Sequence, residues 1–429
     1  MIKTVSPASL RGKLRVIPSK SASHRAVMLA SLAASETSLE PIQLSRDIEA
    51  TLECAKALGL ASGAEITPHE LPGFSRVRLC GGQSAASGTQ RVLDCGESGS
   101  TLRFFIPLAL DGRGSVRFVG HGRLMQRPLE LYERLFVPRG IRWQLSGDTL
   151  LVEGRLTAGE YALRGDVSSQ FITGLLLALP GLDGESVIRV TTRLESRAYV
   201  ELTRRIQASF GVVSHWEDES TLVVPGRQRA MSPGAFSVEG DWSHAAFYLV
   251  AGSIGAAGPL LLSGLDRAST QGDRAIVPLL QSMGALIREE EGGLCVCPSR
   301  LHGITADVEQ TPDLVPTLAV AMAAAQGESR ITGAQRLRIK ESDRLAAMRA
   351  ALCAAGAEVT ELPDGLVIRG GKRLHGATID GCNDHRIVMA MAVASAIADG
   401  DLVISDAEAV AKSAPAFWAE FASLGGIAR

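Results

Sequence analysis

Basic and hydroxyl side chains stand at the start of several long apolar segments of the chain. Lys20, Ser21 and Arg25 lie where the apolar segment 24–35 begins, and Arg386 lies where 385–400 begins. Serine, aspartate and asparagine at such places cap helices, which is the simplest interpretation of the hydroxyl residues. Capping does not explain the cations, because a positive charge at a helix N-terminus opposes the helix dipole. Cations beside free N–H groups bind anions, so the pattern predicts sites for an anionic ligand.

A second kind of polar position lies between the apolar segments. Residues 338–344 read RIKESDR, with five charges directly before a predicted helix. A solvated charged face is the usual meaning of such a run. At the matching places, however, other parts of the chain carry Arg127, Ser196 with Tyr199, and Lys412. We therefore expect two sets of binding side chains, both at helix starts.

The elements that must position these residues recur along the chain. Successive amphipathic segments end in an apolar-plus-glycine step, at Gly59, Gly140, Gly211, Gly284, Gly356 and Gly425, which are 69 to 81 residues apart. This period indicates six copies of a unit made of helix, strand, helix and further strands. One helix of each unit is too uniformly apolar for a surface position, so we expect it inside its domain.

The last unit lacks a strand, because the sequence stops after its second helix. The unused segment is 2–17, which we expect to complete the sheet of that unit. This predicts a discontinuous lobe, 1–18 plus 239–429, and a continuous lobe, 19–238, with the chain crossing between them near Pro18 and Glu239.

Bulk properties exclude several classes of protein. The chain has 429 residues and a net charge of -2, which gives no general attraction to nucleic acid or to an acidic membrane surface. No secretory signal follows Met1. The seven cysteines contain no CxxC pair, so we expect buried thiols, no metal site and a reducing cytoplasmic location.

The motifs together resemble the enolpyruvyl transferases over the whole length, and specifically their shikimate branch. The motifs that carry this resemblance occur in the family's order: PSKSASHRA, CGESGSTLR, GRLMQRP, DVSSQFITGLL, ESRAYVELT, VEGDWSHAAF, STQGD, RIKESDRL and NDHRIVMA. The resemblance implies an α/β fold, a two-lobed inside-out α/β barrel of six βαββαβ repeats, three per lobe. It also implies that the substrates, phosphoenolpyruvate and shikimate-3-phosphate, bind in a cleft over which the lobes close.

The resemblance implies roles for individual residues. The catalytic residues would be Asp313, Glu341 and Lys20. The shikimate-3-phosphate contacts would be Lys20, Ser21, Arg25, Ser168, Ser169, Gln170, Ser196, Tyr199, Asp313 and Lys340. The phosphoenolpyruvate contacts would be Lys20, Gly99, Arg127, Gln170, Arg344, Arg386 and Lys412. On this basis 19–238 mainly binds shikimate-3-phosphate, and the other lobe supplies phosphoenolpyruvate contacts and the acid–base groups.

These residue types suit the implied reaction. A hydroxyl adds across the enol double bond and phosphate is then eliminated, so two acid–base groups are needed at different places. Arginine and lysine hold the phosphates and carboxylates of the two substrates together. No step calls for a metal or an organic cofactor, and we expect a monomer with no cofactor.

Alternatives and departures remain. One alternative is the branch of the family that acts on UDP-N-acetylglucosamine. That branch usually has Lys-Asn in the first motif and a cysteine in a loop, whereas this chain has Lys20-Ser21 and no cysteine in 121–126. The other alternative is an inactive binding protein, which would not need both Asp313 and Glu341. Ser19, Glu97 and Arg336 differ from the residues common in the family. Glycine rather than alanine at Gly99 implies sensitivity to glyphosate.

Overall fold

The computed structural model describes residues 1–82, 90–255 and 257–429, and the chain divides into two compact units. Unit 1 consists of Met1–Ile17 and Glu239–Arg429, and unit 2 of Pro18–Val238. The division expected from the sequence puts residue 18 in unit 1 and otherwise has the same boundaries.

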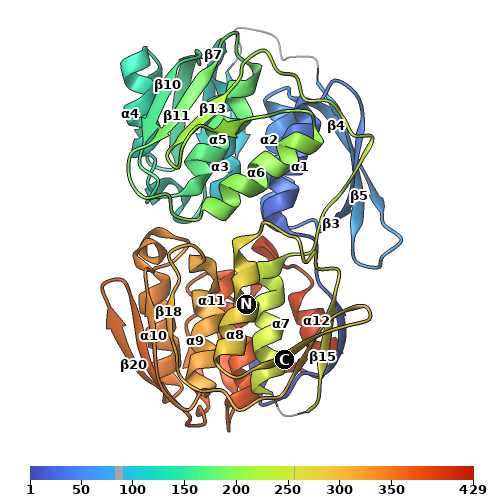
Figure 1. Cartoon of the computed structure of the whole chain (residues 1–429), viewed down its shortest axis with the longest axis vertical. Coiled ribbons are helices and arrows are strands. Elements are labelled where there is room, and N and C mark those ends of the chain that lie inside the picture. The colour runs from blue at the N-terminus through green and yellow to red at the C-terminus, as the bar shows by residue number, and fades with distance from the viewer. Residues whose placement is uncertain (83–89, 256) are drawn as a thin grey trace. The chain divides into compact units, whose positions relative to one another are not determined.

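Unit 2 has apolar helices in its interior and sheets around them. In Figure 1 the strands β10, β11 and β13 lie on one side of α3, α5 and α6, and β3, β4 and β5 lie on another side of the helices. Its helices are α1 (Lys20–Leu32), α2 (Arg46–Ala57), α3 (Gly99–Ala109), α4 (Glu130–Phe136), α5 (Ser169–Ala178) and α6 (Arg197–Ser209), with 3₁₀ turns η1 (Leu124–Gln126), η2 (Val137–Arg139) and η3 (Leu179–Gly181).

The described strands of unit 2 form separate four-stranded sheets, each with its own spatial order of strands. The first is β14 (Ala235–Ser237), β3 (Thr37–Ile42), β5 (Ser75–Gly81) and β4 (Ala61–Pro68). The second is β6 (Arg91–Asp94), β7 (Asp111–Val119), β9 (Thr149–Arg155) and β8 (Arg142–Ser146). The third is β10 (Glu160–Leu163), β11 (Ser186–Val190), β13 (Thr221–Val224) and β12 (His215–Trp216).

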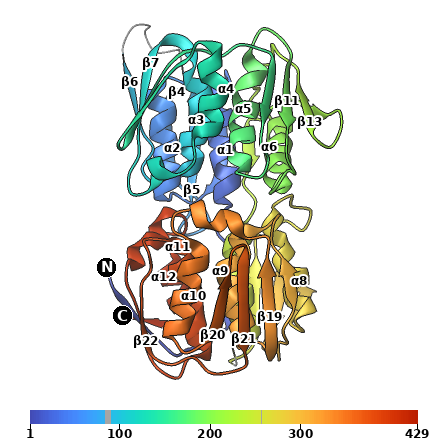
Figure 2. The ribbon, with the colours of Figure 1, turned by 90° about the vertical axis from the view of Figure 1, so that its left-hand side faces the viewer.

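Unit 1 repeats this plan, with α7, α9 and α11 packed against one another in its interior. Figure 2 shows β19, β20 and β21 of one of its sheets. Its helices are α7 (Trp242–Ile254), α8 (Ile276–Ser282), α9 (Val315–Ala324), α10 (Arg344–Ala354), α11 (His385–Ala394) and α12 (Phe417–Ser423), with 3₁₀ turns η4 (Gly272–Ala275), η5 (Pro312–Leu314), η6 (Gln335–Ile339), η7 (Ser395–Ile397) and η8 (Ala407–Lys412).

The sheets of unit 1 have the same number of strands. The first is β16 (Leu286–Glu290), β17 (Gly293–Cys297), β15 (Leu260–Ser263) and β2 (Gly12–Arg15). The second is β18 (Thr305–Asp307), β19 (Gly327–Thr332), β21 (Gly365–Gly370) and β20 (Glu358–Leu362). The third is β22 (Ala377–Ile379), β23 (Leu402–Ile404), β1 (Lys3–Ser6) and β24 (Ile427–Ala428).

Each strand next to a crossing belongs to the unit that the chain is leaving. β2 precedes α1 in the chain but pairs in parallel with β15 of unit 1, and β14 precedes α7 but pairs in parallel with β3 of unit 2. β1 lies between β23 and β24 and completes the last sheet, as the missing strand of the sixth repeat predicted. The expectation of one strand in 2–17 was incomplete, because the segment contributes to two sheets.

The glycine of each repeat ends the second helix of its unit. All six, from Gly59 to Gly425, have φ between 70° and 98°. This left-handed conformation closes a helix C-terminus, and it favours glycine because a Cβ is strained there. The sequence period therefore marks real helix ends.

The interior helices pack closely through a second kind of glycine. In α5, a Cβ on Gly174 would lie 2.2 Å from the hydroxyl of Tyr132 and 2.4 Å from the carbonyl oxygen of Arg103 in α3. The Tyr132 hydroxyl donates to the carbonyl oxygens of Arg103 and Phe171 at 3.0 and 2.9 Å. Gly174 thus lets α3 and α5 approach, which sets the spacing of their N-terminal ends. Among the described helices, none is long and apolar enough to cross a membrane.

Candidate active site

A buried arginine, Arg344, forms the centre of an ion-pair network in unit 1. Its Nη1 donates to Asp313 Oδ1, its Nη2 to Glu341 Oε2 and its Nε to Asp384 Oδ2, each at 2.8 Å. The side chain of Arg344 is only 2% exposed. The guanidinium therefore holds three carboxylates together, a role that the sequence did not predict for this residue.

Three helix starts bring these groups together. Asp313 lies in η5 directly before α9, Arg344 opens α10, and Asp384 caps α11 by accepting a hydrogen bond from the Arg386 N–H at 3.0 Å. Asp343 caps α10 by accepting from the N–H of Ala346 at 3.1 Å. Because α9 packs against both α10 and α11, the polar residues at their starts must meet.

Asp313 lies among cations. Its Oδ1 is 3.6 Å from Lys340 Nζ, its Oδ2 is 3.4 Å from Arg386 Nη2, and its carbonyl oxygen accepts from Arg386 Nη1 at 3.0 Å. Burial of the carboxyl opposes its ionisation, but Arg386, Lys340 and Arg344 outweigh that effect and hold the pKa of Asp313 far below its usual range. Asp313 is therefore ionised at neutral pH without ligand.

Lys412 lies at the same helix start. It ends η8, which packs against α11, and its Nζ donates to the carbonyl oxygen of Asn383 at 2.6 Å. Cys382 and Asn383 have φ of 53° and 47°, a left-handed conformation that non-glycine residues seldom adopt. Such strain is frequent at functional sites, and in this chain it sets the direction of the Asn383 carbonyl.

Sequence reasoning missed Asp273, which lies in η4 and is 1% exposed. The hydroxyl of Ser243 donates to its Oδ2. Burial, followed by the charge of Asp313, raises the pKa of Asp273 to about 6. Asp273 belongs to the STQGD motif, which the sequence showed. The sequence did not show that the carboxyl of Asp273 is buried near the carboxylate of Asp313.

In unit 2 the two cations of α1 are both held by protein groups. Lys20 Nζ donates to Asp47 Oδ2 at 2.8 Å. Arg25 is 3% exposed and reaches α5 and α6, where its Nε donates to Thr203 Oγ1 at 2.7 Å and its Nη2 to Thr173 Oγ1 at 3.3 Å. Arg25 therefore also ties three helices together.

Tyr199 and Ser21, both predicted as substrate contacts, meet Arg25 through their backbones. The carbonyl oxygen of Ser21 accepts from Arg25 Nη1 at 2.7 Å, and that of Tyr199 accepts from Arg25 Nη2 at 3.2 Å. Ser196 occupies the N-cap position of α6 with φ of 56° but donates or accepts no capping bond through its side chain. The structure thus brings Ser21, Arg25 and Tyr199 together, and their contact with a substrate stays a prediction.

A second arginine network joins α3 and α5. Arg103 Nη1 donates to Gln170 Oε1 at 2.8 Å, and Gln170 Nε2 donates to Ser100 Oγ at 2.9 Å. A Cβ on Gly99 would lie 2.7 Å from Arg127 Nη1 and 2.9 Å from Arg103 Nη1. Three residues predicted as phosphoenolpyruvate contacts, Gly99, Arg127 and Gln170, therefore lie together around Arg103.

Ser168 and Ser169 lie at the start of α5. The hydroxyl of Ser168 accepts from the N–H of Gln170 at 3.3 Å, so Ser168 is an N-cap as well as a predicted ligand contact. The residue that sequence reasoning missed in this cluster is Arg103. Its signal in the sequence was a lone arginine inside the apolar run 102–112, which needs a buried partner.

Each unit therefore contains its own polar cluster at helix starts. Cluster 1, in unit 1, is Asp313, Lys340, Glu341, Arg344, Asp384, Arg386 and Lys412. Cluster 2, in unit 2, is Lys20, Ser21, Arg25, Gly99, Arg103, Arg127, Ser168, Ser169, Gln170, Ser196 and Tyr199. The residues predicted to contact phosphoenolpyruvate fall in both clusters, so neither unit holds all of them.

Metal ligation is not built into the described part of the chain. No group of three or more His, Cys, Asp or Glu side chains there is arranged to hold a metal ion. The seven cysteines are all free thiols.

Known proteins resemble this chain in both sequence and structure. The family model described as EPSP synthase (3-phosphoshikimate 1-carboxyvinyltransferase) matches residues 5–421. The chain belongs to the EPSP synthase family. The 3-phosphoshikimate 1-carboxyvinyltransferases of Clostridium novyi (strain NT) and Clostridium kluyveri are 42% and 41% identical to it, each over 99% of this chain and 97% of the relative.

The fold agrees with that family. An EPSP synthase structure from Acinetobacter baumannii matches with a TM-score of 0.79 and 26% identity, covering 100% of this chain and 99% of that one. The enolpyruvyl transferase NikO from Streptomyces tendae has the same fold, with a TM-score of 0.79 at 16% identity, over 100% and 98% of the two chains.

These findings confirm the predicted family, the inside-out α/β fold class and the transferase activity. EPSP synthases transfer the enolpyruvyl group of phosphoenolpyruvate to the 5-hydroxyl of shikimate-3-phosphate and release phosphate, a step of aromatic amino acid biosynthesis. The roles of individual residues stay predictions.

Proposed function

We propose that clusters 1 and 2 both bind the anionic substrates of this EPSP synthase, and that Asp313 and Glu341 perform its proton transfers. The observation that supports this most strongly is the convergence of three helix starts, three carboxylates and four cations in cluster 1. Cations, free helix N–H groups and carboxylates at one place can bind phosphate and also move protons.

The reaction needs anion binding before it needs proton transfer. Each substrate carries a phosphate and a carboxylate, and their mutual repulsion must be offset by protein cations. Arg127 in cluster 2 and Arg386 and Lys412 in cluster 1 are suited to phosphoenolpyruvate. Arg25 with the serines of α5 and α6 is suited to shikimate-3-phosphate.

The proton balance then assigns two tasks. In the addition step the 5-hydroxyl loses its proton as its oxygen bonds to C2 of phosphoenolpyruvate, and C3 gains a proton to become a methyl group. In the elimination step C3 loses a proton as the C–O bond to phosphate breaks, which restores the double bond. Asp313 and Glu341 are the acids available in cluster 1, and Lys20 is available to stabilise the leaving phosphate.

Asp313 becomes a better base when substrate binds. A carboxylate held by three cations has a low pKa and a weak affinity for protons. An anionic substrate that draws on Arg386 and Lys340 relieves part of this effect and raises the pKa of Asp313 toward its usual range. Binding and proton transfer are coupled in this way.

The test compares Asp313→Ala, Glu341→Ala and the control Glu328→Ala, an exposed glutamate of the same unit. We expect each of the first two variants to lose roughly 100-fold or more in kcat, the usual scale for general acid–base groups. Dissociation constants for shikimate-3-phosphate, measured by calorimetry, should change much less, and the control should match wild type. Near wild-type kcat in either variant would contradict the role of that residue.

We also propose that the enzyme is a cytoplasmic monomer. The seven free thiols support a reducing compartment. Analytical ultracentrifugation should give one species at the mass of one chain, 45.2 kDa. A stable dimer at micromolar concentration would contradict the monomer.

A further inference from the structure

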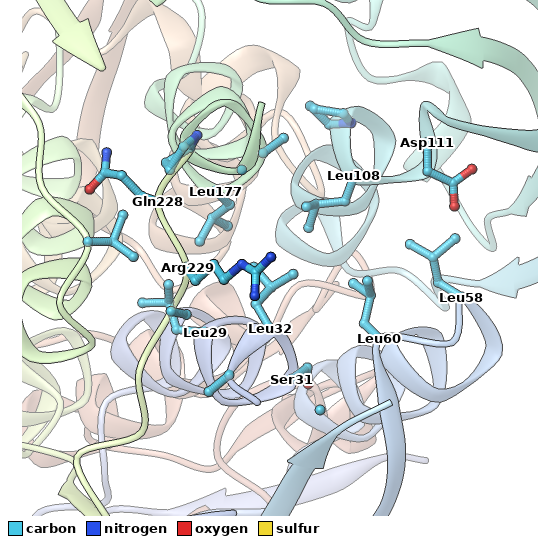
Figure 3. A pocket seen from close by; sticks show the side chains of 18 of the residues that line it. Leu29, Ser31, Leu32, Leu58, Leu60, Leu108, Asp111, Leu177, Gln228 and Arg229 are labelled. Carbon is cyan, nitrogen blue, oxygen red and sulfur yellow. The ribbon is translucent and has the colours of Figure 1, made fainter. Parts of the chain in front are cut away.

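A cavity of about 1080 Å³ lies in unit 2 at the C-terminal ends of α1, α3 and α5 (Figure 3). The residues 29–34, 107–110 and 177–182 contribute to its wall. Cluster 2 occupies the N-terminal ends of the same three helices, and α1 with 13 residues is about 20 Å long. The cavity shares no residue with either cluster, so a ligand bound in it would contact none of the residues predicted to bind the substrates.

The wall of the cavity is apolar and only partly covered by protein. Leu32, Leu60, Leu108 and Leu182 line it and remain half-buried, although they pack against the core. In Figure 3 the side chains of Leu29 and Leu32 lie on one side of the space and those of Leu108 and Leu177 on another. Concave apolar surface of this size is typical of small-molecule sites.

One buried polar atom in the wall lacks a partner. Gln207 lines the cavity and is 1% exposed. Its Nε2 donates to the carbonyl oxygen of Leu176 at 2.6 Å, while its Oε1 has no hydrogen-bond partner among the described residues. A buried amide oxygen without a donor is costly. Its neighbours enclose this oxygen, so a ligand with an O–H or N–H group would reach it only after the Gln207 side chain turns toward the cavity.

The rim of the cavity is positively charged. Arg229 lines it and is exposed, and no hydrogen bond or ion pair of its side chain occurs within the described residues. Figure 3 shows its guanidinium reaching between the leucines. Arg113 lies on the same rim. The nearby carboxylate of Asp111 is occupied by Arg91, whose Nη1 and Nη2 donate to it at 2.6 and 2.8 Å, so it does not neutralise Arg229.

We propose that this cavity is a second small-molecule site, for an amphipathic carboxylate with an apolar ring and a hydrogen-bond donor on that ring. The leucines contact the ring, and Arg229 pairs with the carboxylate. The Gln207 side chain turns toward the cavity, so that its Oε1 accepts from the donor. Binding in this cavity does not compete with phosphoenolpyruvate or shikimate-3-phosphate.

The test uses 3-(4-hydroxyphenyl)propionate as the probe and calorimetry on the full chain. A ligand of about a dozen non-hydrogen atoms should bind with a Kd of roughly 0.05 to 1 mM at one site per chain. Its Kd should be unchanged at saturating shikimate-3-phosphate. Two matched probes isolate the polar contacts. 3-Phenylpropionate lacks the donor and 2-(4-hydroxyphenyl)ethanol lacks the carboxylate, and each should bind about 5-fold more weakly or worse.

Variants locate the site. Arg229→Gln should weaken the carboxylate probe about 5-fold or more and leave the uncharged alcohol unaffected, a difference that a loss of stability would not produce. The control Arg134→Gln changes an exposed arginine of α4 outside the cavity and should have no effect. Leu108→Trp should narrow the cavity beside the leucines and weaken binding of all three probes.

Three results would overturn the proposal. They are an absence of saturable binding up to about 10 mM, equal affinity of wild type and Arg229→Gln for the carboxylate probe, and displacement of the probe by shikimate-3-phosphate. Because Arg229 is on the surface, its variant should fold, so the test stands even if Leu108→Trp does not.

Discussion

The cations of both clusters have protein partners before any substrate arrives. Arg344 holds three carboxylates, Lys20 is paired with Asp47, and Lys412 donates to a carbonyl oxygen. These partners offset the repulsion between like charges gathered at helix starts. Substrate anions must therefore compete with these protein groups for the cations. Substrate binding changes the pKa of the carboxylates that lose part of their pairing.

A substitution at Gly99 gives a prediction for inhibition by glyphosate. A methyl group on Gly99 would press first on the guanidinium groups of Arg127 and Arg103, whose nearest atoms would be 2.7 to 2.9 Å away. The two arginines must therefore move to admit the methyl group, and part of its effect on the inhibitor would be transmitted through them. We expect Gly99→Ala to raise the glyphosate inhibition constant about 10-fold or more and the KM for phosphoenolpyruvate by a smaller factor.

Steady-state kinetics with phosphoenolpyruvate as the varied substrate and glyphosate as the inhibitor measure both constants. Gly181→Ala is the control, because a Cβ there meets nothing within 4 Å. An unchanged inhibition constant in Gly99→Ala, or a wild type indifferent to millimolar glyphosate, would show that the pocket has another shape.

Asp273 gives a prediction for pH. Its folded-state pKa is raised to about 6, whereas an unfolded aspartate titrates near 3.9. The folded protein thus holds a proton that the unfolded chain has lost, and wild-type stability falls as pH rises from about 4 to 6. Asp273→Asn removes this fall, so relative to wild type the variant should gain roughly 1 to 3 kcal/mol across that window.

Urea unfolding at pH 4.5, 6 and 7.5 measures the difference. The other charges near Asp273, on Asp313, Arg386 and Asp241, are the same in both proteins. A difference in unfolding free energy that stays constant with pH would mean that Asp273 titrates normally.

At the residue scale, the sequence predicted which side chains gather but not what holds them. The motifs placed Asp313, Glu341 and Arg344 at one site, and the structure joins them by direct ion pairs. The third carboxylate, Asp384, looked like a simple helix cap. Its second role needs the packing of α10 against α11, and spacing along a chain does not reveal such a contact.

At the element scale, the period of six glycines was sufficient to predict the repeat. The left-handed φ of each glycine explains why, since a helix end of this kind needs a specific residue type. The sheets that β2 and β14 join, each in the unit that the chain is leaving, were not predictable in the same way. Strands of three or four residues are too short for a clear alternation of apolar and polar residues. The local sequence does not indicate which sheet such a strand joins.

The position of β1 gives a prediction for stability. Val5 is fully buried and pairs with both Leu402 and Ala428, while Thr4 is only partly buried. Val5→Ala should cost about 2 kcal/mol of stability, and the control Thr4→Ala should cost less than about 1. Hydrogen exchange should quicken in peptides from unit 1, including 402–404 and 427–428. Equal quickening in peptides from unit 2 would contradict the assignment of β1 to unit 1.

At the scale of the whole molecule, the chain is one enzyme built from two units, each of which carries part of the predicted substrate contacts. The family membership rests on similarity along nearly the entire chain, and the sequence motifs were sufficient to predict it because they are many and in order. The contacts between these residues needed the structure, because the ion pairs join side chains of different repeats.

The most direct test is phosphate release from phosphoenolpyruvate by the purified full chain, with shikimate-3-phosphate, with UDP-N-acetylglucosamine and with no acceptor. We predict phosphate release only with shikimate-3-phosphate, in an amount equal to the enolpyruvyl product and unchanged by excess chelator. Release with UDP-N-acetylglucosamine, release without an acceptor, or no release with shikimate-3-phosphate from a folded protein would contradict the account.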